Sequence, residues 1–175
     1  MRIVWAFSAL AMFAASPAAA HTQEQLDCAL TKASAELRAN WVDAVTNPPS
    51  EEVREAIDAE MYKVASECAN ELGMPVNEQI KYLEYVDARV TQAELARRLA
   101  DSGVPAPVID ASLDFGPGRS NPLLESLSDE QIDQMIAALA AAGVDVTALS
   151  PQDWDNIGGY ASATNDTYAF LNNLQ

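Results

Sequence analysis

The sequence contains one histidine, His21, and two cysteines, Cys28 and Cys68, among its 175 residues. Serine and cysteine hydrolases that depend on an internal histidine base are therefore excluded. The same shortage excludes a histidine- or thiolate-rich transition-metal site, because copper held at an amino-terminal His21 needs a second histidine from elsewhere in the chain. The glycine-rich Phe115–Ser120 stretch lacks the lysine of a phosphate-binding loop. We therefore assign no catalytic residue, no metal and no cofactor from the sequence.

Basic residues are also scarce, since 10 Lys and Arg stand against 26 Asp and Glu and give a net charge of −16. Nucleic acid is excluded as a partner, because binding to phosphates depends on Lys and Arg. An anionic membrane surface is excluded by the same repulsion. A strongly acidic protein favours a cationic protein partner, although its charge also keeps it soluble.

Long apolar runs are missing after residue 20, and none approaches the roughly 20 residues of a membrane span. Before that point, Arg2 precedes a run over residues 3–15 that is apolar apart from Ser8, and three alanines end at Ala20. This pattern predicts a signal peptide over residues 1–20, cleaved before His21. Its removal leaves 155 residues with a net charge of about −17, which we expect to form a single domain in the periplasm or outside the cell, with no membrane insertion.

Sustained alternation of apolar and polar residues is absent, which predicts an all-α fold of about six or seven helices. We expect a compact bundle that is built on an N-terminal helical hairpin over residues 21–75, with the remaining helices in residues 76–175. A first helix over residues 23–46 has neither proline nor glycine, and Pro48 and Pro49 end it. A second helix begins after Ser50 and ends at Gly73.

Cys28 and Cys68 each lie twenty positions from Pro48, so an antiparallel hairpin places them at the same height. This spacing predicts a Cys28–Cys68 disulfide, with buried thiols or pairing between chains as the alternatives. Periodicity further predicts that the side of the first helix with Ala35, Ala39 and Val42 faces the second helix. Its Leu30, Leu37 and Trp41 side should then face the remaining chain.

Helix signals continue to the end of the chain. An apolar pattern opens near Asn77, a capping box at Thr91–Glu94 begins or restarts a helix, and Gly103 ends it. A short helix follows near Val108, residues 115–122 form a loop, and a capping box at Ser128 starts a helix that Gly143 stops. Another helix starts at Ser150, Gly158 and Gly159 weaken or break it, and a terminal helix covers 160–174. Residues 95–104 and 135–144 share Leu, Ala, Gly and Val at an offset of forty, which either a repeat or shared helix-end chemistry explains.

The candidate binding surface joins the 115–122 loop to the glycine pair near residue 158, where aromatic and polar groups gather. Its residues are Arg119, Trp154, Asp155 and Tyr160. Core packing is the alternative for Trp154 and Tyr160. A second group of oxygen donors predicts either a cation site or, as the alternative, polar side chains at solvated helix ends. That group consists of Asp153, Asp155, Asn156, Asn165 and Asp166.

The composition favours a non-catalytic, exported binding protein with a cationic protein partner such as a lysozyme. The alternative is a carboxylate-dependent, glycosidase-like hydrolase that acts on cell-wall glycan. Glu125-Ser126 is similar to the Glu-Ser pair of some cell-wall transglycosylases, but the Gly, Leu, Met and Gln run that follows in that family is missing here. The hydrolase hypothesis predicts a concave pocket that holds a buried Glu or Asp, and a structure with no such cleft would exclude it.

Overall fold

The computed structural model describes residues 21–174, with side chains for residues 21–172, so the predicted signal peptide lies outside it. This part of the chain is all-helical, as predicted, with eight helices and no strand. The helices are α1 (Gln23–Leu26), α2 (Cys28–Lys32), α3 (Ala35–Thr46), α4 (Glu51–Glu71), α5 (Val76–Asp101), α6 (Ala106–Ser112), α7 (Asp129–Ala141) and α8 (Pro151–Leu174). None of these helices is both long and apolar enough to cross a bilayer.

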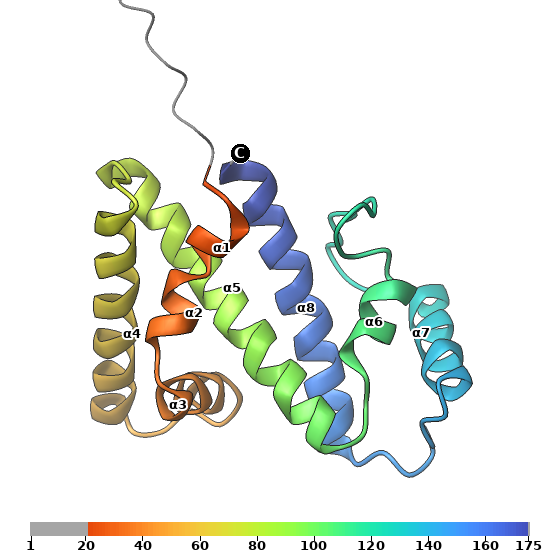
Figure 1. The fold of residues 1–175 in the computed structure, drawn as a ribbon. Coiled ribbons are helices and arrows are strands. Elements are labelled where there is room, and N and C mark those ends of the chain that lie inside the picture. Colours follow the sequence, from red (N-terminus) through yellow and green to blue (C-terminus); the bar gives the residue numbers. More distant parts are fainter. Residues whose placement is uncertain (1–20, 175) are drawn as a thin grey trace, which may run out of the picture.

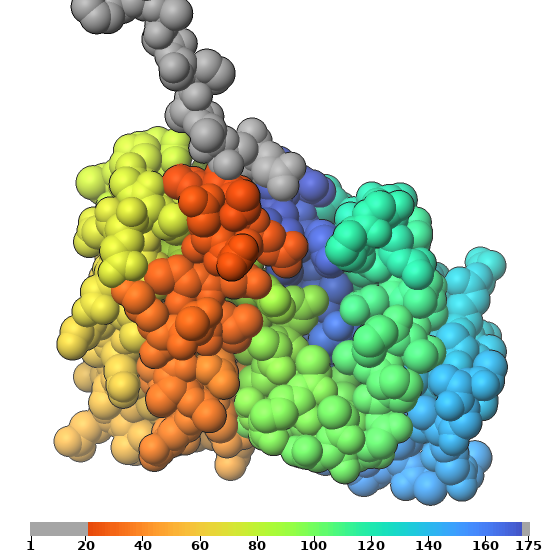
Figure 2. Space-filling view, viewed as in Figure 1, coloured from red at the N-terminus to blue at the C-terminus, as the bar shows by residue number. Residues whose placement is uncertain are grey.

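The two long helices α5 and α8 pack side by side and run through the centre of the molecule (Figure 1). The helices α1 to α4 lie on one side of this pair, and α6 and α7 lie on the other. Residues of α1 and α2 cover the middle of α5 on the face shown in Figure 2. Two buried apolar clusters result. One lies mainly among α1 to α5 and includes Leu171 of α8, the other lies mainly among α5 to α8 and includes Val42 of α3, and Trp41 and Tyr168 pack against both.

The predicted single helix over residues 23–46 is wrong, because the chain breaks it twice. The first break is at Asp27, which lies between α1 and α2. Its carboxylate accepts hydrogen bonds from Tyr85 Oη at 2.6 Å and from Arg89 Nε at 2.9 Å, both on α5. The helix path is therefore set at this point by a polar contact with a segment about sixty residues away in sequence.

The second break is at Ser34, which begins α3. Its side-chain oxygen accepts the backbone N–H of Leu37 at 3.0 Å, the bond expected of a helix N-cap. Arg38 Nη1 donates to the carbonyl oxygens of Leu30 at 3.1 Å and Ala33 at 2.6 Å, near the C-terminal end of α2. Both new helix ends thus have hydrogen-bond partners, which removes the cost of interrupting the helix.

The break at Ser34 changes the direction of α3, which is seen almost along its axis in Figure 1 while α4 runs up the page. The predicted faces of this segment are therefore only partly correct. Ala35 is exposed, and Leu37 is buried beside Ile57 of α4. Val42 belongs to the buried cluster that contains Leu95 of α5. Leu37 and Val42 have thus exchanged their predicted roles, whereas Trp41 contacts the remaining chain as predicted, through its hydrogen bond to Asp87 of α5.

The disulfide prediction is confirmed, and Cys28 on α2 is joined to Cys68 on α4. Their Cα atoms lie 5.9 Å apart, a common separation for a disulfide. Helix α4 has the predicted bounds, with Gly73 after its end at φ +67°. Equal distance from the proline turn therefore located the bridge even though the first segment is not one continuous helix.

Helix α5 is continuous, so the predicted restart at Thr91–Glu94 is not used. Glu94 is 2% exposed and pairs with Arg97 at 2.7 Å and Arg98 at 3.0 Å. Burial raises the pKa of Glu94, but the hydrogen bonds and charges of the two arginines outweigh burial and lower its pKa. Glu94 therefore serves as an ion-paired structural group in the middle of a helix.

Helix α8 is also continuous, so the predicted break at Gly158 and Gly159 is wrong. A Cβ placed on Gly159 would lie 3.1 Å from Leu95 Cδ1 of α5, whereas a Cβ on Gly158 would meet nothing within 4 Å. Gly159 thus permits close approach of α5 and α8. The burial gained from that contact outweighs the poor helix propensity of two adjacent glycines.

The similarity between residues 95–104 and 135–144 has a local cause. The N–H of Val104 bonds to the carbonyl of Leu99 at 2.8 Å, and the N–H of Val144 bonds to that of Leu139 at 3.1 Å. Gly103 and Gly143, which precede the two valines, have φ angles of +73° and +90°. The same bond joins Met74 to Ala69 after α4 at 3.0 Å. The shared residues are the signature of a common helix C-terminal motif.

Candidate functional site

The four residues of the predicted binding surface do not form one site. Tyr160 is 4% exposed, and its hydroxyl donates to the Asp110 carboxylate at 2.9 Å. Burial raises the pKa of Asp110, and the Tyr160 hydrogen bond and the charge of Arg119 partly oppose that rise. Trp154 is half-buried against the second apolar cluster, and Asp155 on the next position is exposed. Tyr160 therefore binds Asp110 directly, whereas Arg119 influences that aspartate only through its charge.

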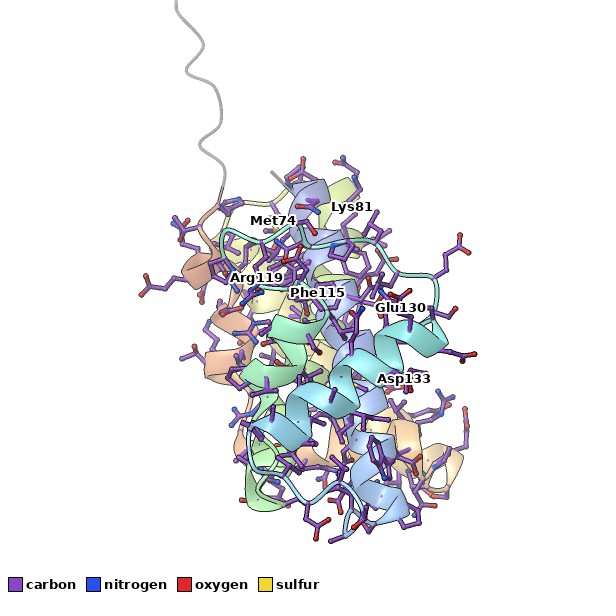
Figure 3. All side chains as sticks on the ribbon, turned by 90° about the vertical axis from the view of Figure 1, so that its right-hand side faces the viewer. Met74, Lys81, Phe115, Arg119, Glu130 and Asp133 are labelled. Atoms are coloured by element: carbon purple, nitrogen blue, oxygen red, sulfur yellow. A yellow bond between two sulfur atoms is a disulfide. The ribbon has the colours of Figure 1, made fainter. Side chains whose placement is uncertain are left out.

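The 115–122 loop uses its own hydrogen-bond donors. The Asp114 carboxylate accepts from the Ser120 backbone N–H at 3.2 Å and from the Ser120 hydroxyl, and Arg119 Nη1 lies 3.7 Å from it. These hydrogen bonds, and to a lesser extent the arginine, lower the pKa of Asp114. Figure 3 shows Arg119 at the outer end of this loop. An internal carboxylate thus already occupies the place where an external anion would bind.

The predicted oxygen-donor group does not converge on a cation either. Asp153 accepts from the Ser102 hydroxyl at 2.6 Å and from Ser150 at the start of α8. Asn165 exchanges hydrogen bonds with the backbone of Leu124 at 2.8 and 3.1 Å. Among the residues that the structure describes, no three His, Cys, Asp or Glu side chains are grouped to hold a metal.

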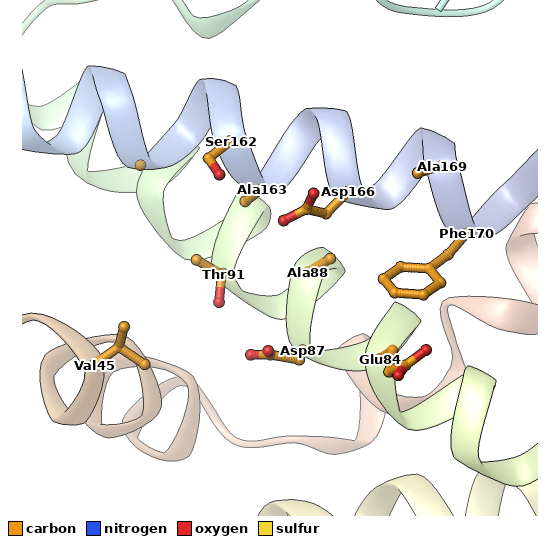
Figure 4. A pocket seen from close by; sticks show the side chains of 11 residues that line it. Val45, Glu84, Asp87, Ala88, Thr91, Ser162, Ala163, Asp166, Ala169 and Phe170 are labelled. Atoms are coloured by element: carbon orange, nitrogen blue, oxygen red, sulfur yellow. The ribbon is translucent and has the colours of Figure 1, made fainter. Parts of the chain in front are cut away.

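A different feature, missed at the sequence level, is a groove of about 570 Å³ along α5 and α8. We call it the acidic groove, because Glu84 and Asp87 of α5 and Asp166 of α8 line it together with no Lys or Arg. Its remaining lining consists of Val45, Ala88, Thr91, Gly159, Ser162, Ala163, Ala169 and Phe170. Figure 4 shows Asp87, Glu84 and Asp166 on facing helices, with the Phe170 ring at one end.

Asp87 occupies the centre of this region. Trp41 Nε1 of α3 donates to its Oδ1 at 2.8 Å. Although much of the Asp87 side chain remains accessible to solvent, the surrounding helices displace part of its hydration and raise its pKa. The Trp41 hydrogen bond lowers that pKa, and the negative charges of Asp166 and Asp58 raise it again. The net direction of the pKa is upward, mainly because of the lost hydration, and the negative charges of Asp166 and Asp58 add to it.

A smaller hollow of about 290 Å³ adjoins the groove between α4 and α5. We call it the aromatic pocket, because Trp41 and Tyr62 line it. Glu84 and Asp87 line both hollows and so connect them. The other lining residues of the pocket are Asp58, Met61, Ala65, Leu83 and Val86. Together the two hollows combine aromatic and apolar surface with four carboxylates.

Among the described residues, one ion pair involves a carboxylate of this site. Arg54 of α4 lies 3.6 Å from Asp58, but it is also bound to Glu51 at 2.7 Å. Within the described residues, Glu84, Asp87 and Asp166 have no ion pair within 4.0 Å. The site can therefore attract a cationic group from outside the chain. Its lining contains no histidine or cysteine that could act as a nucleophile and no basic side chain that could bind an anion.

A partial signal for this site was present in the sequence. Glu84, Asp87 and Thr91 follow one another at three- and four-residue spacing, which places them on one face of a helix, opposite the buried Tyr82 and Tyr85. The contribution of α8 had no such signal, because Asp166 lies about eighty residues further along the chain. Comparison with known proteins adds no assignment, since no family model, curated protein or solved structure matches this chain.

Proposed function

We propose that the chain is an exported, non-catalytic binding protein that docks a cationic protein partner on the acidic groove. Export is supported by the signal-peptide pattern of residues 1–20 and by the Cys28–Cys68 disulfide, a bond typical of oxidising compartments outside the cytosol. Periplasm and extracellular medium are both compatible with this support. We choose a cationic partner because Glu84, Asp87 and Asp166 have no ion pair within the described residues.

The electrostatics of the groove favour a partner with several basic groups. Opposite charges at a solvent-exposed interface each contribute about 0.2 to 1 kcal/mol, so three of them together contribute about 0.6 to 3 kcal/mol. The larger effect of a net charge of −16 is on the rate of encounter, because a strongly charged surface steers oppositely charged partners towards it. Both effects fall with ionic strength, so binding should weaken steeply between low and high salt.

The experiment compares two variants that lose the same charge. The groove variant carries Glu84→Gln, Asp87→Asn and Asp166→Asn, and the Asn at 87 retains an oxygen acceptor for Trp41. The control variant carries Glu125→Gln, Glu130→Gln and Asp133→Asn, three exposed carboxylates that lie outside both hollows. Figure 3 shows Glu130 and Asp133 on α7, which Figure 1 places on the opposite side of the molecule from α4.

Binding of a deca-arginine peptide is measured by isothermal titration calorimetry at low and high salt. The groove variant is expected to bind roughly 3- to 140-fold more weakly than the unmodified protein, which is the above free energy converted at about 1.4 kcal/mol per tenfold. The control variant is expected to change less than about twofold, because the charges removed are distant and screened. Equal losses in the two variants, or binding that does not depend on salt, would contradict docking on the groove.

A second candidate is a carboxylate-dependent hydrolase of cell-wall glycan, and one observation favours it. Asp87 has a raised pKa and lies in a hollow with further carboxylates and an aromatic ring, which are the elements of a glycosidase site. This candidate predicts release of soluble fragments from purified cell-wall glycan, and loss of that activity in Asp87→Asn. Unchanged glycan after prolonged incubation with the unmodified protein excludes it.

A further inference from the structure

The aromatic pocket differs from the acidic groove in its floor. Met61, Ala65 and Val86 are 3%, 0% and 2% exposed, so the bottom of the pocket is apolar. Tyr62, 60% exposed, and Trp41 form its aromatic lining, and the carboxylates of Glu84 and Asp87 connect it to the groove. At about 290 Å³ the pocket lies at the lower limit of ligand sites and suits a single large side chain better than a whole ligand or a helix.

An apolar floor under a charged rim selects for amphipathic side chains. Arginine and lysine place an aliphatic stem on apolar surface while the charged head remains in a polar setting. Of the two, arginine stacks on aromatic rings and pairs with carboxylates through two N–H groups at once, whereas the lysine ammonium is a strongly hydrated point charge. A purely apolar side chain would fill the floor but leave Glu84 and Asp87 desolvated without a cation.

The resident arginine does not take this place. Arg54 is on α4, as is Tyr62, but its guanidinium is held by Glu51 one helical turn earlier, with Asp58 on its other side. It lines a neighbouring hollow with Trp41 and Asp58, not the aromatic pocket. The cation that the pocket favours therefore comes from another molecule.

We infer that the aromatic pocket is the anchor subsite for one arginine side chain of the cationic partner, with its stem along the apolar lining of the pocket and its guanidinium between Tyr62 and the carboxylates of Glu84 and Asp87. This inference rests on the proposed docking of a cationic partner in the acidic groove. The groove then supplies steering and charge, and the pocket supplies preference for arginine over lysine.

The test measures selectivity between deca-arginine and deca-lysine peptides of the same length and charge. A single cation–π contact contributes about 1 kcal/mol, which corresponds to roughly a fivefold preference for deca-arginine. Tyr62→Ala should abolish this preference, and because Tyr62 is largely exposed the substitution leaves the fold intact. Ile80→Ala is the control, since Ile80 is 63% exposed and lines neither the acidic groove nor the aromatic pocket. It should leave the preference unchanged.

A spectroscopic measurement locates the contact independently. In a Trp154→Phe background, the indole N–H signal of Trp41 is identified by nuclear magnetic resonance as the remaining tryptophan signal of residues 21–175. Deca-arginine should shift this signal more than deca-lysine does, and Tyr62→Ala should remove the difference. Equal affinity for the two peptides in the unmodified protein, or a preference that survives Tyr62→Ala, overturns the anchor subsite. If the groove variant still loses more affinity than its charge-matched control, the proposed function stands while the anchor subsite fails.

Discussion

The close approach of α5 and α8 sets the width of the acidic groove, and adjacent glycines on α8 provide a direct test of it. Gly158 and Gly159 differ in their surroundings although both lie in the interior of one helix. Replacing glycine by alanine in a helix interior stabilises it by about 1 kcal/mol. At Gly158 a new methyl group meets nothing within 4 Å, so Gly158→Ala should raise the free energy of unfolding by about that amount.

At Gly159 the same gain is opposed by a collision. The new methyl group would lie 3.1 Å from Leu95 Cδ1, and Leu95 is 3% exposed within the second apolar cluster. Adding a methylene-sized group to a packed core costs about 1 to 3 kcal/mol. Gly159→Ala should therefore be about 1 to 3 kcal/mol less stable than Gly158→Ala, although the two proteins have the same composition.

Both variants are measured by urea denaturation followed by circular dichroism at 222 nm, with thermal unfolding as a second readout. For a chain of about 150 residues the difference corresponds to at least 2 to 4 °C in Tm. In a Leu95→Ala background the opposing contact is absent, so Gly159→Ala should then stabilise the protein as Gly158→Ala does. Equal stabilisation by the two substitutions in the unmodified background would refute the close packing of α5 on α8.

Two further predictions concern the disulfide and the charge on Asp87. Replacing Cys28 and Cys68 by alanine should lower the free energy of unfolding by about 4 kcal/mol, because the bridge closes a loop of 40 residues in the unfolded chain. Guanidinium denaturation should give the same free energy of unfolding for the variant and for the reduced unmodified protein. A loss under 1 kcal/mol contradicts the prediction. The pKa of Asp87 is higher in the folded than in the unfolded state, so the folded state binds this proton more tightly. As the pH rises above 3.8, the ordinary pKa of an aspartate, ionisation of Asp87 therefore lowers the stability of the fold. Asp87→Asn should accordingly increase stability at pH 7 and have no effect at pH 3, measured by urea denaturation at both; a loss of stability at pH 7 contradicts the raised pKa.

If the groove and pocket act as proposed, the acidic surface has two separate roles. The overall charge brings a basic partner to the protein, and the site at Tyr62, Glu84 and Asp87 decides which basic side chain is held. The first role depends on salt and tolerates single substitutions. The second depends on shape and is sensitive to loss of one ring, because cation–π contacts need an aromatic face at the right position.

Local signals predicted the ends of most helices. The capping box at Ser128, the glycines at 73, 103 and 143, and the proline turn at residues 48–49 act within four or five residues of their own position. The disulfide was predicted by counting residues from the turn along one straight helix, and the pairing is correct although that helix is broken at Asp27 and Ser34. These features were predictable because each depends on bonds within the segment that carries it.

The sequence by itself thus determined the all-helical class, most of the helix ends and the cysteine bridge. Only the tertiary structure decided that Asp27 and Ser34 interrupt the first segment, that α8 continues through Gly158 and Gly159, and that Asp166 faces Glu84 and Asp87. Local preferences are worth about 1 kcal/mol each, whereas burial of a single large side chain contributes about 1.5 to 3 kcal/mol. Contacts between distant segments therefore override local preferences. The groove is a product of those contacts, because its two walls lie about eighty residues apart in the chain.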